Sequence, residues 1–361
     1  MPLRLNGSTS GYSEIDAPAI AGNNTLVLPT ANGAANQLLK NGSTPGVLEY
    51  ASMTLDSSGN LNSVASINGG PLAGFRNLVT NGDFQIWQRG VTFTNANGYT
   101  ADRWAVGGTG TLCNVGQGSH PSGLSERVAL NFTGVAGNTR SFALQKIESQ
   151  NMANLYPAPY AATQVTLSVN IYSTSARTID LIADYANTAD NFSAVTNITS
   201  HSVSVGANTF NRYSHTFTLP AEAARGMQIV LNAQTGITSG TVAFSMVQLE
   251  PGAVATPFER RPIGTELALC QRYYQKNNGN PSRALFQGYC VNGQGYPART
   301  PFHQQMRGTP IINLTHADSL GFPGTVGSTS ADASAFVESR IANSTQNSGY
   351  YISDWTASAE L

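Results

Sequence analysis

Five aromatic side chains near the end of the sequence have the chemistry needed to hold a sugar. They are Tyr289, Tyr296, Tyr350, Tyr351 and Trp355, and they lie among Asn, Gln and Ser residues. Tyr and Trp rings combine an apolar face with a polar edge, so they can stack on a sugar ring and hydrogen-bond to its hydroxyl groups. The alternative is that these rings pack together in the core of an oligomer. The sequence therefore predicts a neutral-glycan contact in this zone.

Residues that could carry catalysis do not gather at any familiar spacing. The sequence has no nucleotide-binding loop, no His-Glu-x-x-His, no nucleophile elbow and no Cys-x-x-Cys. Glycan hydrolysis needs two carboxylates flanking the scissile bond, and most of the 20 Asp and Glu residues lie beside turns or basic residues. The histidines, none at metal-ligand spacing, are His120, His201, His215, His303 and His316. We expect no catalytic residues and no enzyme activity.

The composition argues against several classes of protein. The 361-residue chain has a formal net charge of -1, and only 11% of its residues are charged, with no basic stripe that would bind nucleic acid. No apolar run approaches the ~20 residues that span a bilayer. The first residues lack the apolar core of a signal peptide. We expect synthesis in a cytoplasm, no membrane insertion, and buried thiols rather than disulfides at Cys113, Cys270 and Cys290.

The residues before the aromatic zone have the pattern of a β-sandwich. Across residues 77–262, apolar and polar side chains alternate repeatedly, as at 165–171, 213–219 and 227–231. Further short strands carry Val128, Leu130 and Phe132, then Phe142 and Leu144, then Val242, Phe244 and Met246. Strands with one apolar face each indicate two packed antiparallel sheets. No helix longer than a turn or two is expected there.

Residues 263–361 begin with the only convincing helix of the sequence. Its signals are Thr265 as a cap, Glu266 in the first turn, Leu267, Cys270 and Tyr274 on one face, and Lys276 and Asn277 at its end. Candidate strands follow at 285–291, 311–315, 336–341 and 350–353. The sequence predicts a compact β-rich unit after this helix.

Residues 1–76 contain few large apolar side chains, and Tyr12, Tyr50 and Phe75 are their only aromatics. A segment this poor in apolar bulk should not offset its own chain entropy as a monomer. We expect contact with other chains to order it, in a homotrimer or against a larger scaffold; a flexible linker is the alternative. The local signals are a short strand at 26–28 and turns at Asn32-Gly33 and Asn41-Gly42.

Several segments resemble the tail-fibre proteins of tailed bacteriophages, cyanophages among them. Residues 77–90 (NLVTNGDFQIWQRG) and 242–252 (VAFSMVQLEPG) resemble the two ends of their jelly-roll, carbohydrate-binding-like domain. Residues 7–30 resemble an N-terminal module of phage structural proteins. Further similar segments are 99–104 (YTADRW), 266–274 (ELALCQRYY), 306–310 (MRGTP) and 354–361 (DWTASAEL). The division that follows is a virion-attachment segment at 1–76, a jelly-roll domain at 77–262, and a helix plus receptor-binding tip domain at 263–361.

The resemblance also implies a metal site. In sugar-binding jelly rolls of this kind, an Asn-Gly-Asp-Phe segment lies near a structural calcium, with help from an acidic residue at the far end of the domain. Asp83 and Glu250 are the implied ligands, although calcium takes six to eight oxygens and the sequence offers only these two carboxylates. The alternative is a turn followed by buried Phe84 and Trp87.

In the similar segment at 99–104, we expect Asp102 and Arg103 to pair near the surface. We expect Trp104 to fill the sandwich core rather than stack on a sugar.

The function implied by the resemblance is that of a phage tail fibre. Such a protein would be a homotrimer in the virion, would anchor to tail or baseplate proteins through residues 1–76, and would adhere to a host surface polysaccharide. One alternative is a structural virion protein without receptor binding, such as a head decoration fibre or a tail adaptor. A glycan depolymerase is less favoured, because such tailspikes usually rest on a large parallel β-helix and the sequence has no such repeat.

Overall fold

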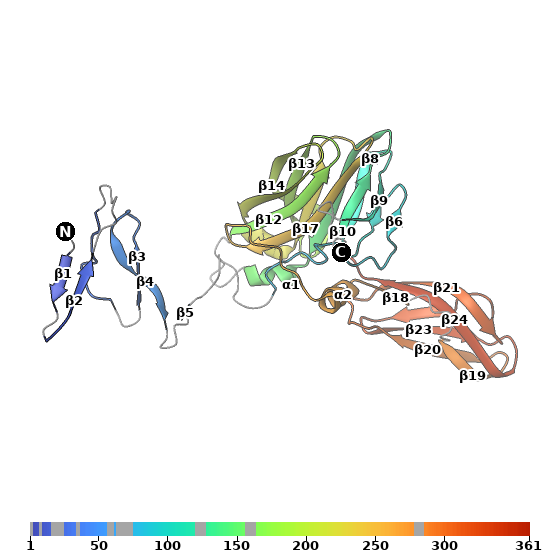
Figure 1. Cartoon of the computed structure of the whole chain (residues 1–361). Helices are drawn as coiled ribbons and strands as arrows, with labels where there is room; N and C mark the ends of the chain where they lie inside the picture. The colour runs from blue at the N-terminus through green and yellow to red at the C-terminus, as the bar shows by residue number, and fades with distance from the viewer. Residues whose placement is uncertain are drawn as a thin grey trace. The chain divides into compact units, whose positions relative to one another are not determined.

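Figure 1 shows the computed structural model of the chain. The structure describes residues 3–6, 9–15, 25–33, 37–55, 61–62, 75–119, 128–155, 164–277 and 285–361. The chain divides into two compact units, Met1–Ile67 and Asn68–Leu361. The fold is mainly β and antiparallel, as predicted. The predicted boundary between the jelly roll and the C-terminal region lies inside the second unit and stays a prediction.

The strands of the first unit are short. They are β1 (Leu3–Asn6), β2 (Tyr12–Ile15), β3 (Gln37–Asn41), β4 (Leu48–Leu55) and β5 (Leu61–Asn62). β1 pairs with β2, and β3, β4 and β5 form a three-stranded sheet. The predicted strand at 26–28 is reduced to a single parallel bridge between Val27 and Val47. Part of the phage-like segment, residues 16–24, lies outside the described residues.

The part of the first unit that the structure describes buries almost no apolar side chains. Ala51 is the only buried apolar side chain among those of this unit that the structure describes. The exposed large apolar side chains are Leu26, Val27, Leu28, Leu39, Val47 and Tyr50, and Leu28 reaches 67% exposure. Burial on this scale offsets little of the entropy lost when the chain is ordered. The sequence-based expectation of a core-poor segment agrees with this distribution.

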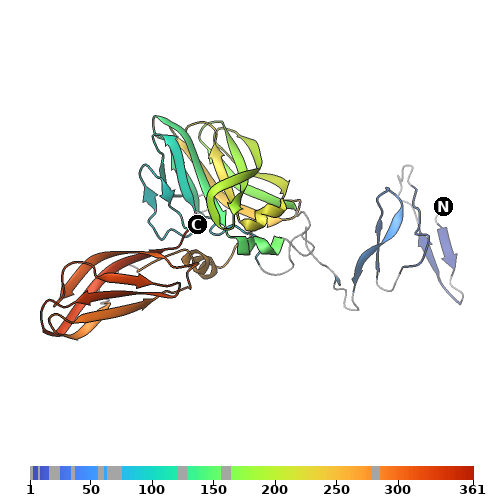
Figure 2. The ribbon, with the colours of Figure 1, turned by 180° about the vertical axis from the view of Figure 1, so that it is seen from behind.

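The second unit begins with a sandwich of two six-stranded antiparallel sheets (Figures 1 and 2). The first sheet has the order β15 (Thr209–Thr218), β12 (Gln164–Ser173), β17 (Thr241–Pro251), β10 (Val128–Thr133), β9 (Asn114–Ser119) and β6 (Thr92–Phe93). The second has the order β14 (Asn191–Val205), β13 (Arg177–Thr188), β16 (Met227–Ala233), β11 (Asn138–Ile147), β8 (Ala105–Gly110) and β7 (Gly98–Tyr99). Among the residues of the sandwich that the structure describes, the helical segments are short: α1 (Ser149–Met152), η1 (Ala153–Leu155) and η2 (Ala221–Arg225).

The inward faces of the two sheets form one large core. Alternate residues of β12 and β17 point into it, as the pattern predicted; examples are Leu167, Ile171 and Phe244. Trp104 also lies in this core with no exposed surface, which confirms its predicted packing role. Its ring lies 5.0 Å from that of Phe84, and its Nε1 donates to the Asn81 carbonyl oxygen.

One strand of the sandwich presents the opposite face from the one expected. On β11, Phe142 and Leu144 are half-buried on the outer side, while Ser141 and Ala143 point inward. Successive side chains of this strand point to opposite sides of the sheet. The alternation in the sequence therefore identifies a strand, but it does not say which set of side chains faces the core.

After the sandwich, α2 (Ile263–Gln271) leads into the C-terminal strands. This helix starts before the predicted cap and ends before Tyr274, which lies instead in strand β18 (Tyr274–Lys276). The prediction that Tyr274 lies on the helix is therefore wrong. Tyr274 is extended because its strand, β18, pairs with the last strand, β24. In the described part of the chain, no helix has the length and apolarity needed to cross a membrane.

The C-terminal strands form two small facing sheets. One contains β18, β24 (Gln346–Ser358), β19 (Phe286–Cys290) and β21 (Ile311–Leu320). The other contains β20 (Gly295–Pro301), β23 (Ala335–Ile341) and β22 (Ser328–Ala331). Aromatic side chains fill the space between them. The four predicted strands are present, whereas β18, β20 and β22 were not predicted.

The last residues tie the C-terminal strands to the sandwich. The Glu360 carboxylate pairs with Arg89 at 3.0 Å and also with Arg103, whose guanidinium lies 3.4 Å from the centroid of the Tyr273 ring. Arg103 is 2% exposed, and Asp102 is bound by Gln88 and Arg89 instead. The predicted surface pairing of Asp102 with Arg103 is wrong, because both side chains serve this buried junction.

Candidate functional site

The outer side of the second sandwich sheet carries an ordered array of polar and apolar side chains. We call the solvent side of β14, β13, β16, β11 and β8 the outer face. Strand register sets its side chains in three rows that cross the sheet. The first row holds Ser202, Asp180, Asn232 and Phe142, the second Ser200, Ile182, Val230 and Leu144, and the third Asn197, Asp184, Gln228 and Lys146. The second row, which we call the apolar row for its three aliphatic side chains, thus lies between two rows that each contain one carboxylate.

Asp180 is held in place by neutral donors on the neighbouring strands. Its Oδ1 accepts hydrogen bonds from Ser202 Oγ (2.7 Å) and Gln234 Nε2 (2.7 Å), and its Oδ2 accepts one from Asn232 Nδ2 (3.0 Å). Arg140 Nε donates to Asn232 Oδ1 (2.6 Å), which fixes the orientation of that amide. Asp180 is therefore rigid before any ligand arrives.

Asp184 has a matching environment in the third row. Asn197 Nδ2 donates to its Oδ1 and Gln228 Nε2 to its Oδ2, both at 2.8 Å. No ion pair of Asp180 or Asp184 occurs among the residues that the structure describes. A carboxylate offers about four lone-pair positions. Asp180 accepts three hydrogen bonds and Asp184 two, so each keeps acceptor capacity at a residue that is 8% exposed.

Phe142, in the first row, lies over its cross-strand neighbour Gly107. A Cβ atom on its cross-strand partner Gly107 would come within 2.7 Å of the Phe142 Cζ, so the absence of a side chain there makes room for the ring. The Arg140 guanidinium carbon lies 5.3 Å from the centroid of this ring. One aromatic ring of the outer face thus lies between Gly107 and the Arg140 guanidinium group.

This arrangement matches the chemistry of a sugar. The C–H faces of a sugar ring can pack on Ile182, Val230 and Leu144, while its hydroxyl groups can donate to the two carboxylates on either side. Sites of this kind combine apolar lining with a few placed polar groups. The sequence signal was present in β13, where two Asp residues four positions apart flank an apolar residue, but it was not recognised because that stretch was not predicted as a strand.

The structure separates the five aromatic residues that the sequence predicted as a glycan site. Tyr289 is 59% exposed, and the half-buried Tyr350 donates from its hydroxyl to Asp318 Oδ2 at 2.9 Å. Tyr296 is half-buried against one aromatic cluster of the C-terminal unit.

Tyr351 and Trp355 do not fit the predicted stacking role. Tyr351 has no exposed surface, and its hydroxyl donates to the Tyr296 and Glu338 carbonyl oxygens. Trp355 is 5% exposed and packs against Phe302 and Phe336. Both lie between the two C-terminal sheets because alternate residues of β24 point inward, so the prediction is corrected for these two residues.

The segment around Asp83 serves as a tight turn against the sandwich. Asn81 has a positive φ of 54°, and its side-chain amide bonds to the backbone of Ile86 and Asp102. A Cβ at Gly82 would lie 2.1 Å from the Val247 carbonyl oxygen, so only glycine fits this approach. The alternative expectation for Phe84 is confirmed, since it is fully buried, and Trp87 is half-buried.

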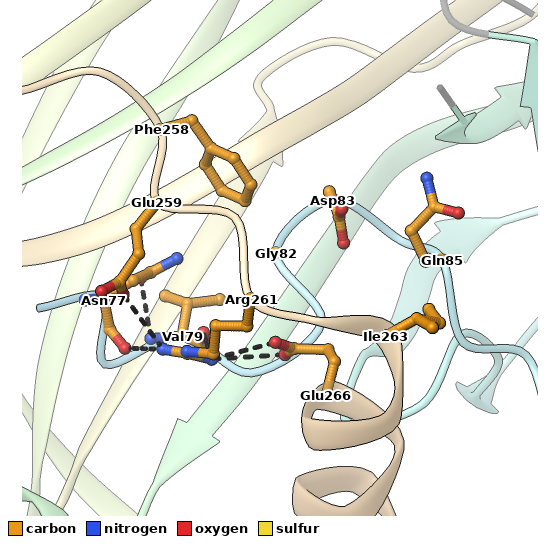
Figure 3. Close-up of a pocket in the computed structure, with 10 residues that line it drawn as sticks. All are labelled: Asn77, Val79, Gly82, Asp83, Gln85, Phe258, Glu259, Arg261, Ile263 and Glu266. Atoms are coloured by element: carbon orange, nitrogen blue, oxygen red, sulfur yellow. Dashed lines mark hydrogen bonds and ion pairs between the residues drawn. The ribbon is translucent and has the colours of Figure 1, made fainter. Parts of the chain in front are cut away.

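The residues present do not fit a calcium ion shared by Asp83 and Glu250. Glu250 is fully buried and already bound by Arg76 Nη2 (2.9 Å) and by the backbone N–H and hydroxyl of Thr256. Asp83 instead lines a small pocket with Glu259, Arg261 and Glu266, shown in Figure 3. Burial, together with Glu266, raises the pKa of Asp83 above its usual value.

A guanidinium group supplies the positive charge in this pocket. Arg261 Nη1 lies 3.2 Å from Glu266 Oε2 and 3.2 Å from the Val79 carbonyl oxygen, and Nη2 donates to the Asn77 carbonyl oxygen (Figure 3). Glu259 also lies 3.6 Å from Arg261. Carbonyl and carboxylate oxygens of the sort that calcium uses are here engaged by an arginine.

Two histidines meet at the edge of the sandwich where β14 and β15 approach. The rings of His201 and His215 stack with centroids 4.2 Å apart, and Thr199 Oγ1 lies 2.9 Å from His215 Nε2. Burial and the neighbouring His201 lower the pKa of His215. Within the described residues, no group of three or more His, Cys, Asp or Glu is arranged to hold a metal ion. His120 lies outside those residues, and the three cysteines are buried and free, as predicted.

Comparison with known proteins gives matches among solved structures alone. No protein-family model matches the chain, and no curated protein matches it. A CBM4 carbohydrate-binding module is 19% identical over 48% of this chain and 99% of that chain, with a TM-score of 0.34. The module TmCBM61, solved with β-1,4-galactotriose, is 14% identical over 49% of this chain and 99% of that chain, with a TM-score of 0.31.

A phage protein is also among the similar structures. The enzymatically active domain of tailspike protein 4 of bacteriophage CBA120 is 18% identical, with a TM-score of 0.34. The match covers 48% of this chain and 21% of that chain, so it spans about a fifth of the tailspike structure. Similarity at this level does not define what this chain binds.

Proposed function

We propose that this chain is a fibre of a tailed bacteriophage that adheres to a glycan on the host surface. The observation that carries the proposal is the outer face, where an apolar row lies between two carboxylates that neutral donors hold in place. The phage-like segments at 77–90, 242–252 and 354–361 support its place in a virion. On this proposal the protein is made in the host cytoplasm and works in the assembled particle.

Binding to bacterial surface polysaccharides tests the proposal. The full chain is applied to an array of such polysaccharides, beside the isosteric double variant Asp180→Asn with Asp184→Asn. Hydrogen bonds to charged groups contribute about 1.5–3 kcal/mol each, so we expect affinity to fall at least tenfold. Glu222→Gln, an exposed carboxylate on η2, is the matched control and should bind like the parent chain. A parent chain that binds no polysaccharide, or a double variant that binds equally well, contradicts the proposal.

We also infer that the fibre is a homotrimer anchored to tail or baseplate proteins through residues 1–76. The support is the exposed apolar surface of the first unit, which other chains would cover. Leu26→Asp with Leu28→Asp should shift the mass measured by light scattering from three chains to one. Val254→Asp, at a position 61% exposed in the second unit, should leave the mass unchanged. A monomeric parent chain at micromolar concentration would refute the trimer.

A structural virion protein without receptor binding is the second candidate. The same exposed surface of the first unit favours it, because attachment to a particle requires no sugar site. Retention on particles combined with absence of polysaccharide binding would select this function over adhesion.

A further inference from the structure

The C-terminal sheet carries a polar groove on the side away from its core. Its lining residues come from β18, β21 and β24 and the residue after β18: Lys276, Asn277, Asn313, Thr315, Asp354, Trp355 and Thr356. The groove has a volume of about 340 Å³. That size lies within the roughly 300–1,000 Å³ of ordinary small-molecule sites. The groove is built from a different sheet and different residues from those of the outer face.

Strand register brings the polar side chains of the groove to one side of the sheet. Thr356 of β24 pairs with Lys276 on one edge and Asn313 on the other, and Asp354 pairs with Thr315. Residues directly opposite one another in a sheet project to the same side, and strand neighbours project to opposite sides. The neighbours of Asp354 and Thr356 accordingly pack in the core, and these five side chains share the solvent side.

Asp354 is fixed as an acceptor by an adjacent amide. Asn277 Nδ2 donates to Asp354 Oδ1 at 2.9 Å, while Asn277 Oδ1 accepts the backbone N–H of Trp355 at 2.9 Å. The amide thus bridges backbone and side chain, and it sets the direction of the carboxylate. Its second oxygen, Oδ2, keeps its acceptor capacity.

The other polar groups of the groove are available to a ligand. Among the residues that the structure describes, the side chains of Lys276, Asn313 and Thr315 have no hydrogen-bond or ion-pair partner. Asn313 and Thr315 are exposed, and Lys276 is half-buried. A cation, an amide and a hydroxyl therefore surround one fixed carboxylate.

We propose that this groove binds a neutral saccharide unit. One positive and one negative side chain cancel in net charge, so neither an anion nor a cation is favoured. The remaining groups are amide and hydroxyl, which pair with sugar hydroxyl groups as donors and acceptors. The inference rests on the proposed adhesive function and deepens it, since one chain then carries two separate glycan sites.

Two sites on one chain change the strength of adhesion. When one site is occupied, the second binds at a high effective concentration, provided that the polysaccharide can reach both. Weak sites can then give firm attachment, and loss of either site removes this gain. The groove thus contributes to retention on the surface rather than to a separate activity.

Polysaccharide binding by the full chain tests the groove. Thr315→Tyr fills the groove and Lys276→Met removes the ammonium group while keeping the stem. Each should lower the apparent affinity on the array at least tenfold. Thr329→Tyr, at an exposed position on β22, is the matched control and should bind like the parent chain. Thermal unfolding of each variant checks that the fold is kept.

The outcomes separate this inference from the proposed function. Residual binding of the Asp180→Asn, Asp184→Asn double variant that is removed by Lys276→Met supports a second site. Full affinity in both Thr315→Tyr and Lys276→Met overturns the groove, while binding by the parent chain still upholds adhesion. A parent chain that binds no polysaccharide overturns both.

Discussion

The sandwich and the first unit of the chain obtain their order in different ways. The sandwich buries alternate side chains of most of its strands in one continuous core. In the described part of the first unit, Ala51 is the only apolar side chain that is buried, and Leu26 and Leu28 are 66% and 67% exposed. The sandwich thus has a large apolar core, whereas the described part of the first unit buries little apolar surface to offset the entropy lost when a chain is ordered. Antiparallel strand pairing therefore occurs with a large apolar core in one region and with almost none in the described part of the other.

The largest expected change in stability comes from removing a buried aromatic side chain of the sandwich. Trp104→Ala removes a fully buried indole and should lower the free energy of unfolding of the second unit by about 3–5 kcal/mol. Tyr50→Ala, at a 37% exposed ring of the first unit, should change the free energy of unfolding of the first unit by less than about 0.5 kcal/mol. Denaturant unfolding followed by circular dichroism measures both. Equal losses would show that the first unit has a core of its own.

A smaller effect is expected from the buried charge beside the sandwich. Arg261→Met leaves Glu266 near uncompensated carbonyl and carboxylate oxygens and should cost about 2–3 kcal/mol. Arg261 and Glu266 side chains are only 5% and 9% exposed, although Glu259 at 24% is partly solvated. The second change Glu266→Gln should restore part of this loss. If the parent chain melts at a lower temperature in chelator, a metal ion rather than Arg261 holds this junction.

The smallest effect concerns the stacked histidines at the edge of the sandwich. The folded pKa of His215 is lowered, so the unfolded chain binds more protons than the folded one below about pH 6.5. The contribution of His215 to the free energy of unfolding should be constant above that pH, and the protein should lose stability as the pH falls below it. His215→Gln should flatten the difference in melting temperature between pH 7 and pH 5. An unchanged pH dependence in that variant would exclude His215 as its source.

Sequence periodicity predicted the sandwich because alternation marks strands with one buried side. At β12, both the existence and the inward set were correct. At β11, alternation was present but its apolar side chains Phe142 and Leu144 face outward, and Ser141, Ala143, Gln145 and Ile147 take the buried positions. A one-residue change of register exchanges the two faces, so periodicity alone cannot choose between them.

Predicting the candidate sites requires the direction of each side chain and the order of the strands in each sheet. The sequence gives the first in part and does not give the second. Tyr350 and Tyr351 are neighbours on one strand, so their side chains had to point to opposite sides, and one of them could have been excluded as a surface ring. The outer face required knowledge of which strands lie side by side. Asp180 and Asn232 are far apart in the chain and meet only through the pairing of β13 with β16.

The Glu360 junction has a mechanical consequence for the second unit of the chain. Arg89 and Arg103 both belong to the sandwich, and both form ion pairs with the Glu360 carboxylate just beyond β24. The chain itself also joins these regions through α2. A pull on the C-terminal strands is therefore shared between a covalent link and two ion pairs that are loaded at the same time. Such parallel loading resists tilting and tearing better than a single flexible tether.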